Sequence, residues 1–246
     1  MNIDIDAVVR PSARLGIVLS SGNRTLEPYF RAFAPADLAI HVTRMRMGSG
    51  GQRGRDDIAT TAIAAAELVG DTGIDAVLLQ GTGIMMERGP AGEAELVAEL
   101  AKAAKAPAYT ATQSVVESLR ALGASRIAVV NPGNDGSVAR ERAYLDAVGI
   151  TVVGAAALDL GDDTFGLTPE QWTAAAQAAD SDEAEAIFLS GSHTRALEAI
   201  TATEAATGKP VVTSIQAALW SGLQRLGDRL TPAPANAALG RLFART

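Results

Sequence analysis

Short apolar runs alternate with amphipathic stretches along the whole chain. The runs are rich in Val, Ile and Leu, and Gly and Pro residues bound them. Continuous runs of this kind are typical of strands that are buried on both faces of a parallel sheet. We therefore predict strands at residues 14–20, 38–43, 76–80, 127–131, 150–156 and 186–190, and two shorter strands after Pro107 and Pro210.

The stretches between these runs carry helix signals. One helix is predicted to begin at Asp56 or Asp57 and to stop near Gly70. A capping-box pattern with proline at the first helical position starts another at Thr168. Further helices are predicted over residues 93–105, 115–122 and 195–207, and one more after residue 213. Strand–helix alternation with short connections predicts an α/β fold of doubly wound, Rossmann-like or flavodoxin-like parallel sheets.

Segments of the first half recur in the second half. Residues 14–23 return as 126–134, residues 75–82 as 185–192, and residues 107–113 as 210–216, always in the same order. We interpret this as an internal duplication, which predicts two pseudo-symmetric α/β domains with the active site in the cleft between them. The predicted first domain comprises residues 1–112 plus 213–246, and the predicted second domain comprises residues 113–212.

Polar residues follow the predicted strands at their carboxyl ends, where open α/β sheets bind ligands. They are Ser21, Asn23, Gly81, Thr82 and Gly83 in the first half, and Asn131, Gly191, Ser192 and His193 in the second. Backbone N–H groups of the two glycine turns are expected to point into the cleft from helix N-termini and to form an anion cradle, with the Thr82 and Ser192 hydroxyls as further donors. None of these turns has the spacing of a dinucleotide fingerprint, and the chain has no Walker lysine motif.

Charge and composition narrow the range of functions. The formal net charge of −7 argues against a nucleic-acid surface. Four arginines, at positions 44, 46, 53 and 55, are interpreted as solvated residues of a Gly-rich loop rather than as an anion grip. No apolar run is long enough to span a bilayer, and the acidic first ten residues do not resemble a signal peptide. We expect a cytoplasmic homo-oligomer with no membrane or nucleic-acid partner.

The absence of cysteine limits the chemistry. It excludes disulfides, thiolate metal sites and a cysteine nucleophile. Only His41 and His193 supply imidazoles, too few for a histidine-rich zinc site, so no metal is predicted, although a carboxylate-based Mg²⁺ site stays open.

Five motifs in order resemble one enzyme group. Ser20-Ser-Gly-Asn-Arg-Thr-Leu-Glu-Pro28 resembles the opening motif of maleate cis–trans isomerases, and Ser190-Gly-Ser-His-Thr-Arg195 resembles their second-half motif without its cysteine. Gln80-Gly-Thr-Gly-Ile-Met-Met-Glu-Arg-Gly89 resembles the first-half loop of arylmalonate decarboxylases. Val211–Trp220 and Gly240–Phe243 also fit the group. The chain is therefore similar to the aspartate/glutamate racemase superfamily, in its maleate isomerase and arylmalonate decarboxylase branch.

The resemblance implies a cofactor-independent enzyme that acts on small carboxylates between two pseudo-symmetric halves. Racemases and maleate isomerases of the group use a cysteine from each half, and the decarboxylases use one, in the second half. In this sequence both positions are glycine, Gly81 and Gly191, and Gly133 replaces a tyrosine that is common after Asn-Pro. The departures fall on catalytic positions, so the activity of the relatives does not transfer directly.

The remaining polar residues supply the candidate chemistry. The pKa of a histidine suits proton transfer near neutral pH, which makes His193 the candidate acid or base; the alternative is a surface histidine near a helix start. Glu87 is a possible second acid or base, with a solvated carboxylate as the favoured alternative. The resemblance assigns Asn23, and less clearly Asn131, to substrate-carboxylate binding. Gln113 and Gln216 are symmetry mates at helix starts, expected to serve packing or capping.

These features predict an enzyme without a cofactor that acts on a small carboxylic or dicarboxylic acid. The expected reaction is cysteine-independent proton transfer beside a carboxylate, or decarboxylation to an enolate, because preorganised donors stabilise such an anion. One alternative is a hydrolase or hydro-lyase in which His193 activates water. A second alternative is a paralogue that binds a carboxylate without turnover.

Overall fold

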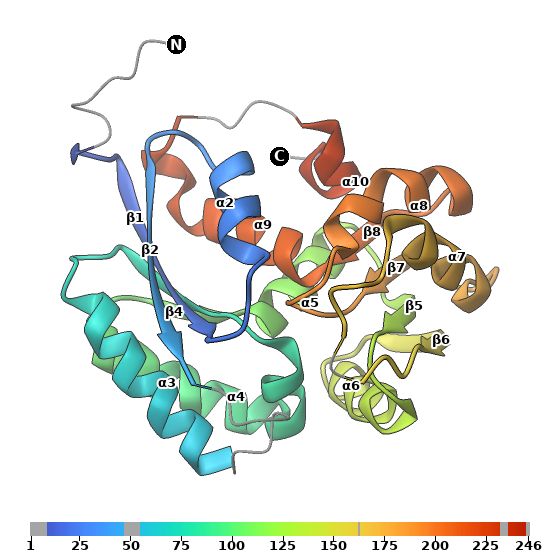
Figure 1. Ribbon diagram of the computed structural model, residues 1–246, viewed down its shortest axis with the longest axis horizontal. Coiled ribbons are helices and arrows are strands. Elements are labelled where there is room, and N and C mark those ends of the chain that lie inside the picture. The colour runs from blue at the N-terminus through green and yellow to red at the C-terminus, as the bar shows by residue number, and fades with distance from the viewer. Residues whose placement is uncertain (1–8, 47–54, 162, 232–235, 245–246) are drawn as a thin grey trace.

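The computed structural model describes residues 9–46, 55–161, 163–231 and 236–244. Within these ranges, eight strands form two parallel sheets of four strands each, one in each half of the chain (Figure 1). The strand orders are β2-β1-β3-β4 and β6-β5-β7-β8, so the second sheet repeats the order of the first. The predicted α/β fold of doubly wound parallel sheets is confirmed.

The eight predicted strands are all present. They are β1 (Ala13–Ser20), β2 (Leu38–Met45), β3 (Ala76–Leu79), β4 (Ala108–Thr110), β5 (Arg126–Asn131), β6 (Thr151–Ala157), β7 (Ala186–Leu189) and β8 (Val211–Thr213). The central strands β3 and β7 are buried along their whole length, which explains their continuous apolar sequences.

The helices agree less closely with the predictions. They are α2 (Leu26–Phe33), α3 (Arg55–Gly70), α4 (Thr82–Ala104), α5 (Ala111–Ala121), α6 (Asp135–Ala147), α7 (Pro169–Ala179), α8 (Ile200–Thr207), α9 (Ser214–Leu226) and α10 (Gly240–Phe243), with 3₁₀ turns at Ala196–Ala199, Gly227–Arg229 and Ala237–Leu239. Neither α2 nor α6 was predicted. Helix α4 begins eleven residues before the predicted start at Glu93. The backbone leaves the helical conformation at Gly89 (φ 72°, ψ 169°), so an unpredicted segment precedes this break and the predicted segment begins with Pro90.

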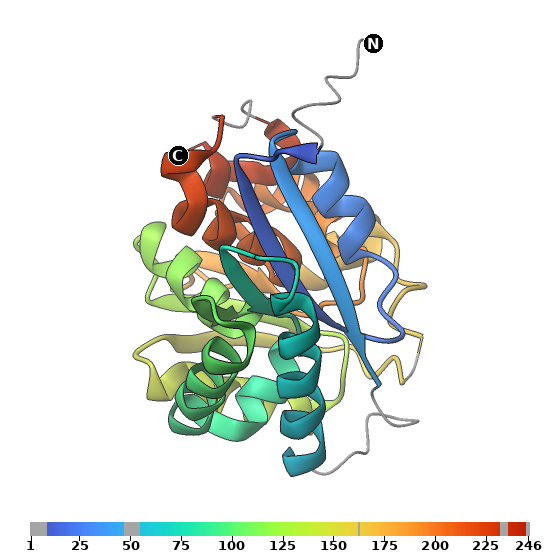
Figure 2. The ribbon, with the colours of Figure 1, turned by 90° about the vertical axis from the view of Figure 1, so that its left-hand side faces the viewer.

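Helices cover both faces of the first sheet. Figures 1 and 2 show α3 and α4 on one face, and α2 and α9 on the other. Side chains of β1 alternate between these two layers. Leu15, Ile17 and Leu19 join the core that includes Leu26 of α2, whereas Val18 joins the core beneath α3 and α4.

The second sheet is covered in the same way. The side chains of Ile127 and Val129 pack in the core beside α5 and α6, and those of Ala128 and Val130 pack toward α7 and α8. Helix α9 contacts α5 and strands of both sheets, β3 and β8. The predicted domain division, with residues 213–246 assigned to the first half, therefore remains a prediction.

Two equivalent capping boxes start α5 and α9. The Thr110 hydroxyl accepts the backbone N–H of Gln113, whose side chain accepts the N–H of Thr110, and Thr213 and Gln216 repeat the arrangement. Gln216 also donates to the Leu239 carbonyl at 2.7 Å, which anchors the C-terminal segment. The predicted capping role of Gln113 and Gln216 is confirmed.

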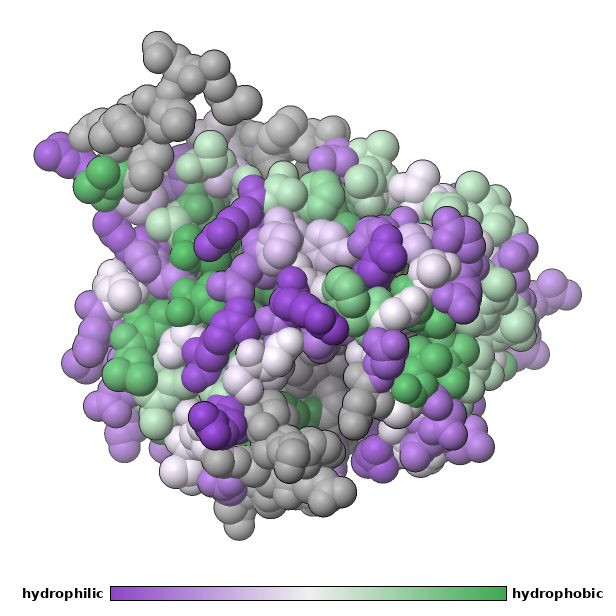
Figure 3. Space-filling view, viewed as in Figure 1, coloured by the Kyte–Doolittle hydropathy of each residue, from purple (hydrophilic) through white to green (hydrophobic). Residues whose placement is uncertain are grey.

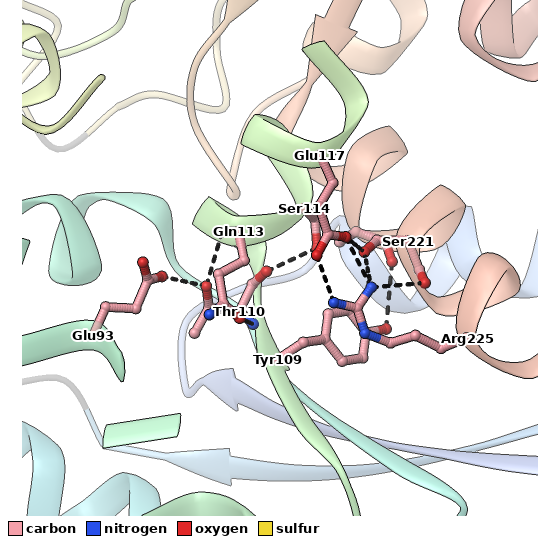
Figure 4. A network of polar contacts seen from close by, with 9 residues as sticks. Glu93, Tyr109, Thr110, Gln113, Ser114, Glu117, Ser221 and Arg225 are labelled. Atoms are coloured by element: carbon pink, nitrogen blue, oxygen red, sulfur yellow. Dashed lines mark hydrogen bonds and ion pairs between the residues drawn. The ribbon is translucent and has the colours of Figure 1, made fainter. Parts of the chain in front are cut away.

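Helices α5 and α9 pack side by side, and a polar network joins them (Figure 4). Glu117 accepts two hydrogen bonds from the Arg225 guanidinium, at 2.8 and 2.7 Å, and a third from the Ser221 hydroxyl. The guanidinium carbon of Arg225 lies 4.4 Å from the ring centre of buried Tyr109. These contacts lower the pKa of Glu117 although its partial burial opposes the shift. The network holds together two helices that follow strands of different sheets.

Within the described ranges, none of the helices combines the length and the apolar character that crossing a bilayer requires.

Gly154 of β6 is expected to tolerate no larger residue. It lies at a register shift of β6 against β5, and a β-carbon there would stand 2.0 Å from the Ala179 carbonyl oxygen at the end of α7. Since a backbone carbonyl cannot rotate away, Gly154→Ala should lower the free energy of unfolding by about 3 kcal/mol, the upper range for overpacked sites. Urea denaturation measures the loss. The matched control, Gly227→Ala, has open space and a φ of −55°, and should be neutral or slightly stabilising. Equal effects of the two substitutions would contradict the steric argument.

Candidate active site

A pocket of about 390 Å³ opens at the carboxyl ends of β3, β5 and β7, and both halves line it. Figure 3 shows the hollow in this face of the molecule. Seven of the ten predicted site residues line the pocket: Thr82, Gly83, Glu87, Asn131, Gly191, Ser192 and His193. Gly81 directly precedes this set as the N-cap of α4, whereas Ser21 and Asn23 lie outside the lining.

The N-terminus of α4 forms the first-half side of the pocket. Gly81 is the N-cap residue, with a φ of 148° that an L side chain rarely adopts, and no side chain caps the helix. Thr82 is buried, and its carbonyl accepts the Thr112 hydroxyl at 3.3 Å. The first turn of α4 contains no acidic residue. The positive end of the helix dipole therefore lies at the pocket, where Thr82 and Gly83 contribute to the lining, and the anion cradle stays a prediction.

The second-half turn differs from the predicted cradle. The backbone N–H of Gly191 donates to the Ser214 hydroxyl at 3.2 Å, and the first helical turn after it begins only at Ala196. The expectation of a helix N-terminus at Gly191 and Ser192 is thus wrong, because residues 191–195 form an irregular turn instead. Gly191 itself has a φ of 118°, and a β-carbon there would stand 2.7 Å from Thr194 Cγ2.

Asn23 links the two halves. Its side-chain amide donates to the Ser192 carbonyl at 2.5 Å, and its Oδ1 accepts the backbone N–H groups of Thr25 and Leu26 at 3.0 and 3.1 Å. The side chain is buried and all these bonds are internal. Carboxylate binding by Asn23, which the resemblance implies, would require the bond to Ser192 to open.

Arg44 holds the turn that contains Ser21. It lies in β2, where its guanidinium donates to the backbone carbonyls of Ser21 and Asn23 at 3.1 and 2.7 Å and pairs with Glu27. The interpretation of Arg44 as a solvated loop residue is therefore wrong. The sequence placed it in a Gly-rich loop because β2 extends two residues beyond the predicted strand. Arg46 is exposed, whereas residue 53 and the side chain of residue 55 lie outside the described structure.

His193 lies at the pocket against an arginine and an aromatic ring. Arg24 Nε donates to His193 Nε2 at 3.3 Å, so the neutral imidazole carries its proton on Nδ1. The Arg24 guanidinium stacks 4.4 Å from the ring centre of Phe165, whose centre lies 6.1 Å from that of His193. Burial, and then the charge of Arg24, lower the pKa of His193. The imidazole is therefore in its neutral, proton-accepting form at neutral pH.

Glu141 of α6 is a pocket residue that the sequence analysis missed. Its side chain is 1% exposed, and it accepts hydrogen bonds from Asn131 Nδ2 at 2.8 Å and from the Ser190 hydroxyl at 2.6 Å. Burial raises its pKa to about 7, although both hydrogen bonds oppose the shift. A carboxyl group of this kind exchanges its proton near neutral pH, which is the property of a general acid or base.

The elevated pKa of Glu141 predicts a pH-dependent stability. An acid with a higher pKa in the folded than in the unfolded chain binds more protons when folded, so its stabilising effect fades as the pH rises from about 4.5 to 7. Between pH 5 and pH 8, the free energy of unfolding of the wild type should therefore fall by about 2 kcal/mol more than that of Glu141→Gln. Urea denaturation of both proteins at the two pH values measures this difference. Parallel pH profiles would show that Glu141 is not the titrating group.

The described residues contain no group of three or more His, Cys, Asp or Glu side chains arranged to hold a metal ion.

Two parallel sheets with a pocket at their strand ends define an α/β protein of two similar halves, and this is the position at which such folds commonly bind small molecules. Residues 35–243 match the family model of arylmalonate decarboxylase. The chain belongs to the arylmalonate decarboxylase family, and the predicted branch is confirmed.

Two characterised relatives extend over nearly the whole chain. An arylmalonate decarboxylase of Bordetella bronchiseptica is 30% identical, over 97% of this chain and 95% of its own length. A maleate isomerase of Nocardia farcinica is 29% identical, over 87% of this chain and 90% of its own length.

Solved structures agree with the fold. The maleate cis–trans isomerase of Nocardia farcinica, as a cysteine-to-serine variant with a covalently bound succinylcysteine intermediate, is 26% identical with a TM-score of 0.86, and the match covers 95% of this chain and 99% of that one. A maleate isomerase of Pseudomonas putida S16 in complex with maleate is 25% identical with a TM-score of 0.84, covering 95% and 98%. The chain described here contains no cysteine, so it cannot form a succinylcysteine.

Proposed function

We propose that the protein is an enzyme that decarboxylates a small carboxylic or dicarboxylic acid, or transfers a proton at the carbon beside its carboxylate, with neither a thiol nor a cofactor. The observation that carries this proposal is the pocket at the strand ends, which is lined together by the start of α4, His193 and the buried carboxyl group of Glu141. Membership of a family with decarboxylase and isomerase relatives supports the same reaction class.

The pocket residues divide between anion binding and proton transfer. Backbone N–H groups at Thr82 and Gly83, with the Thr82 hydroxyl, are placed to bind a carboxylate and the enolate that forms from it. Loss of carbon dioxide, or of a proton, leaves an electron pair that the remaining carboxylate delocalises. A neutral His193 can accept a proton on Nε2 when the bond from Arg24 opens and, once protonated, can return one to carbon.

The test is a panel of small malonates and unsaturated dicarboxylates, each incubated with the protein in D₂O and followed by proton NMR. We expect loss of one substrate, with deuterium incorporated beside the remaining carboxylate, and no effect of a metal chelator. Thr82→Val, which keeps the shape of the side chain but removes its hydroxyl, should lower turnover about tenfold or more. Thermal stabilisation by an acid without product or deuterium incorporation would identify a binding protein instead. If no acid of the panel is bound or turned over, the proposal is rejected.

A further inference from the structure

Ser190 and Glu141 form a buried, hydrogen-bonded pair on the pocket lining. Ser190 directly follows β7 and precedes Gly191. Its side chain and that of Glu141 are nearly inaccessible to solvent, at 4% and 1%, yet both contribute to the pocket lining. The Ser190 hydroxyl lies 2.6 Å from Glu141 Oε1.

Asn131 fixes the orientation of this pair. Its Oδ1 accepts the backbone N–H of Gly133 at 2.8 Å, so its Nδ2 must face Glu141 Oε2, 2.8 Å away. Because an amide nitrogen only donates, Oε2 remains an acceptor in both protonation states. A proton on Glu141 therefore resides on Oε1, where it points to the Ser190 oxygen and frees the Ser190 hydrogen for the pocket.

The hydrogen-bond partners of Glu141 are neutral. Strands β6 and β7 carry no titratable residue, and Arg126 of β5 is exposed and paired with Glu183. On α6 itself, Arg140 lines the pocket and donates to the Ser137 hydroxyl at 3.1 Å. Helix α6 also carries Asp135, Arg142, Tyr144 and Asp146. Outside α6, Glu87 and His193 line the pocket, and Glu93 hydrogen-bonds Tyr144.

We propose that Ser190 is a second proton donor of the pocket, and that Glu141 is the positioning residue that orients the Ser190 hydroxyl and returns a proton to its oxygen. This inference rests on the proposed function. When the bond to the departing carboxylate breaks, its electron pair stays on the substrate carbon. The Ser190 hydroxyl proton forms the new C–H bond, the Oε1 proton of Glu141 moves to the Ser190 oxygen, and water reprotonates Glu141 after product release. Burial, which raises the pKa of Glu141 to about 7, keeps a proton available near neutral pH.

Kinetics as a function of pH test the pair. Because Glu141 must be protonated, the kcat/KM of the wild type, which reports the free enzyme, should fall above about pH 7. This alkaline limb should disappear in Glu141→Gln, which keeps both hydrogen bonds. Ser190→Ala and Glu141→Gln should lower kcat about 100-fold and 10-fold, with KM nearly unchanged. The matched control is Glu93→Gln: Glu93 is equally buried and hydrogen-bonded by Thr110 and Tyr144, but it lies outside this pocket. It should retain the pH profile of the wild type.

A second measurement does not need turnover. Malonate, bound beside Glu141, should raise its pKa further, so that binding at pH 7.5 takes up protons from the buffer. Calorimetry in two buffers of different ionisation enthalpy should detect this uptake in the wild type and in Glu93→Gln, but not in Glu141→Gln. If the wild type turns over an acid and the pH–rate profiles of Glu141→Gln and Ser190→Ala match its own, the inference is overturned while the proposed function stands. If the protein neither turns over nor binds any of the acids, the proposed function is overturned, and the inference that rests on it is overturned as well.

Discussion

Turnover by a His193→Ala variant is expected to fall by about 10²- to 10⁴-fold, the usual contribution of a general acid or base. His193 lines the pocket, and its depressed pKa keeps the imidazole neutral at neutral pH. The substitution leaves intact the backbone N–H groups at the start of α4, to which we assign anion binding. Stabilisation of the variant by a bound carboxylate in thermal unfolding should therefore remain close to that of the wild type.

His41 provides the matched control for this experiment. It lies in β2 and does not line the pocket, so His41→Ala should keep the turnover of the wild type. Steady-state kinetics on the three proteins, with thermal shifts in the presence of the acid, separate the outcomes. A His193→Ala variant that loses binding rather than turnover would show that His193 holds the substrate. Full activity would move the proton transfer to other residues of the pocket.

Truncation of Trp172 to alanine should lower the free energy of unfolding by about 3–5 kcal/mol, the usual range for a buried tryptophan. Trp172 lies in α7, is completely buried, and belongs to the largest side chains of the core between α7 and the second sheet. Because the total stability of a domain is only about 5–15 kcal/mol, the variant should be partly unfolded in moderate urea.

A Trp172→Phe variant separates packing from hydrogen bonding. The indole nitrogen of Trp172 has no hydrogen-bond partner in the described part of the chain. Removal of its N–H therefore breaks no bond, and phenylalanine should cost only about 1–2 kcal/mol for the smaller ring. Urea denaturation followed by circular dichroism measures both variants. Equal losses for alanine and phenylalanine would indicate that the indole nitrogen, through a bound water, stabilises the fold.

Local signals in the sequence were sufficient to predict the strands and several helix ends. An apolar strand buried on both faces needs no partner to be recognised, and the capping box at Thr168 acts within four residues. Helix α2 lacks a capping box, because its N-cap residue Thr25 makes no side-chain capping bond and the Oδ1 of Asn23, two residues earlier, accepts the N–H of Leu26 instead. Helix α6 buries the acidic residue Glu141 beside Tyr144 and Leu145, so the sequence of its buried face lacks the apolar pattern that predicts an amphipathic helix.

The location of the pocket could be predicted from the sequence, but the hydrogen-bond partners and the pKa values of its residues could not. Parallel strands bring their carboxyl ends to one edge of their own sheet, and the internal repeat led us to expect the edges of the two sheets to meet at a cleft. The bond between Asn23 and Ser192 joins residues from different halves and follows only from how the two sheets are placed. The raised pKa of Glu141 likewise depends on burial that only the packed structure supplies.

The backbone at Gly191 has a consequence for evolution and for protein engineering. A cysteine placed there would have to adopt a φ of 118° and push its β-carbon to within 2.7 Å of Thr194. A cysteine introduced at this position by one codon change would therefore strain the turn, unless the side chain of Thr194 and the local backbone shifted with it.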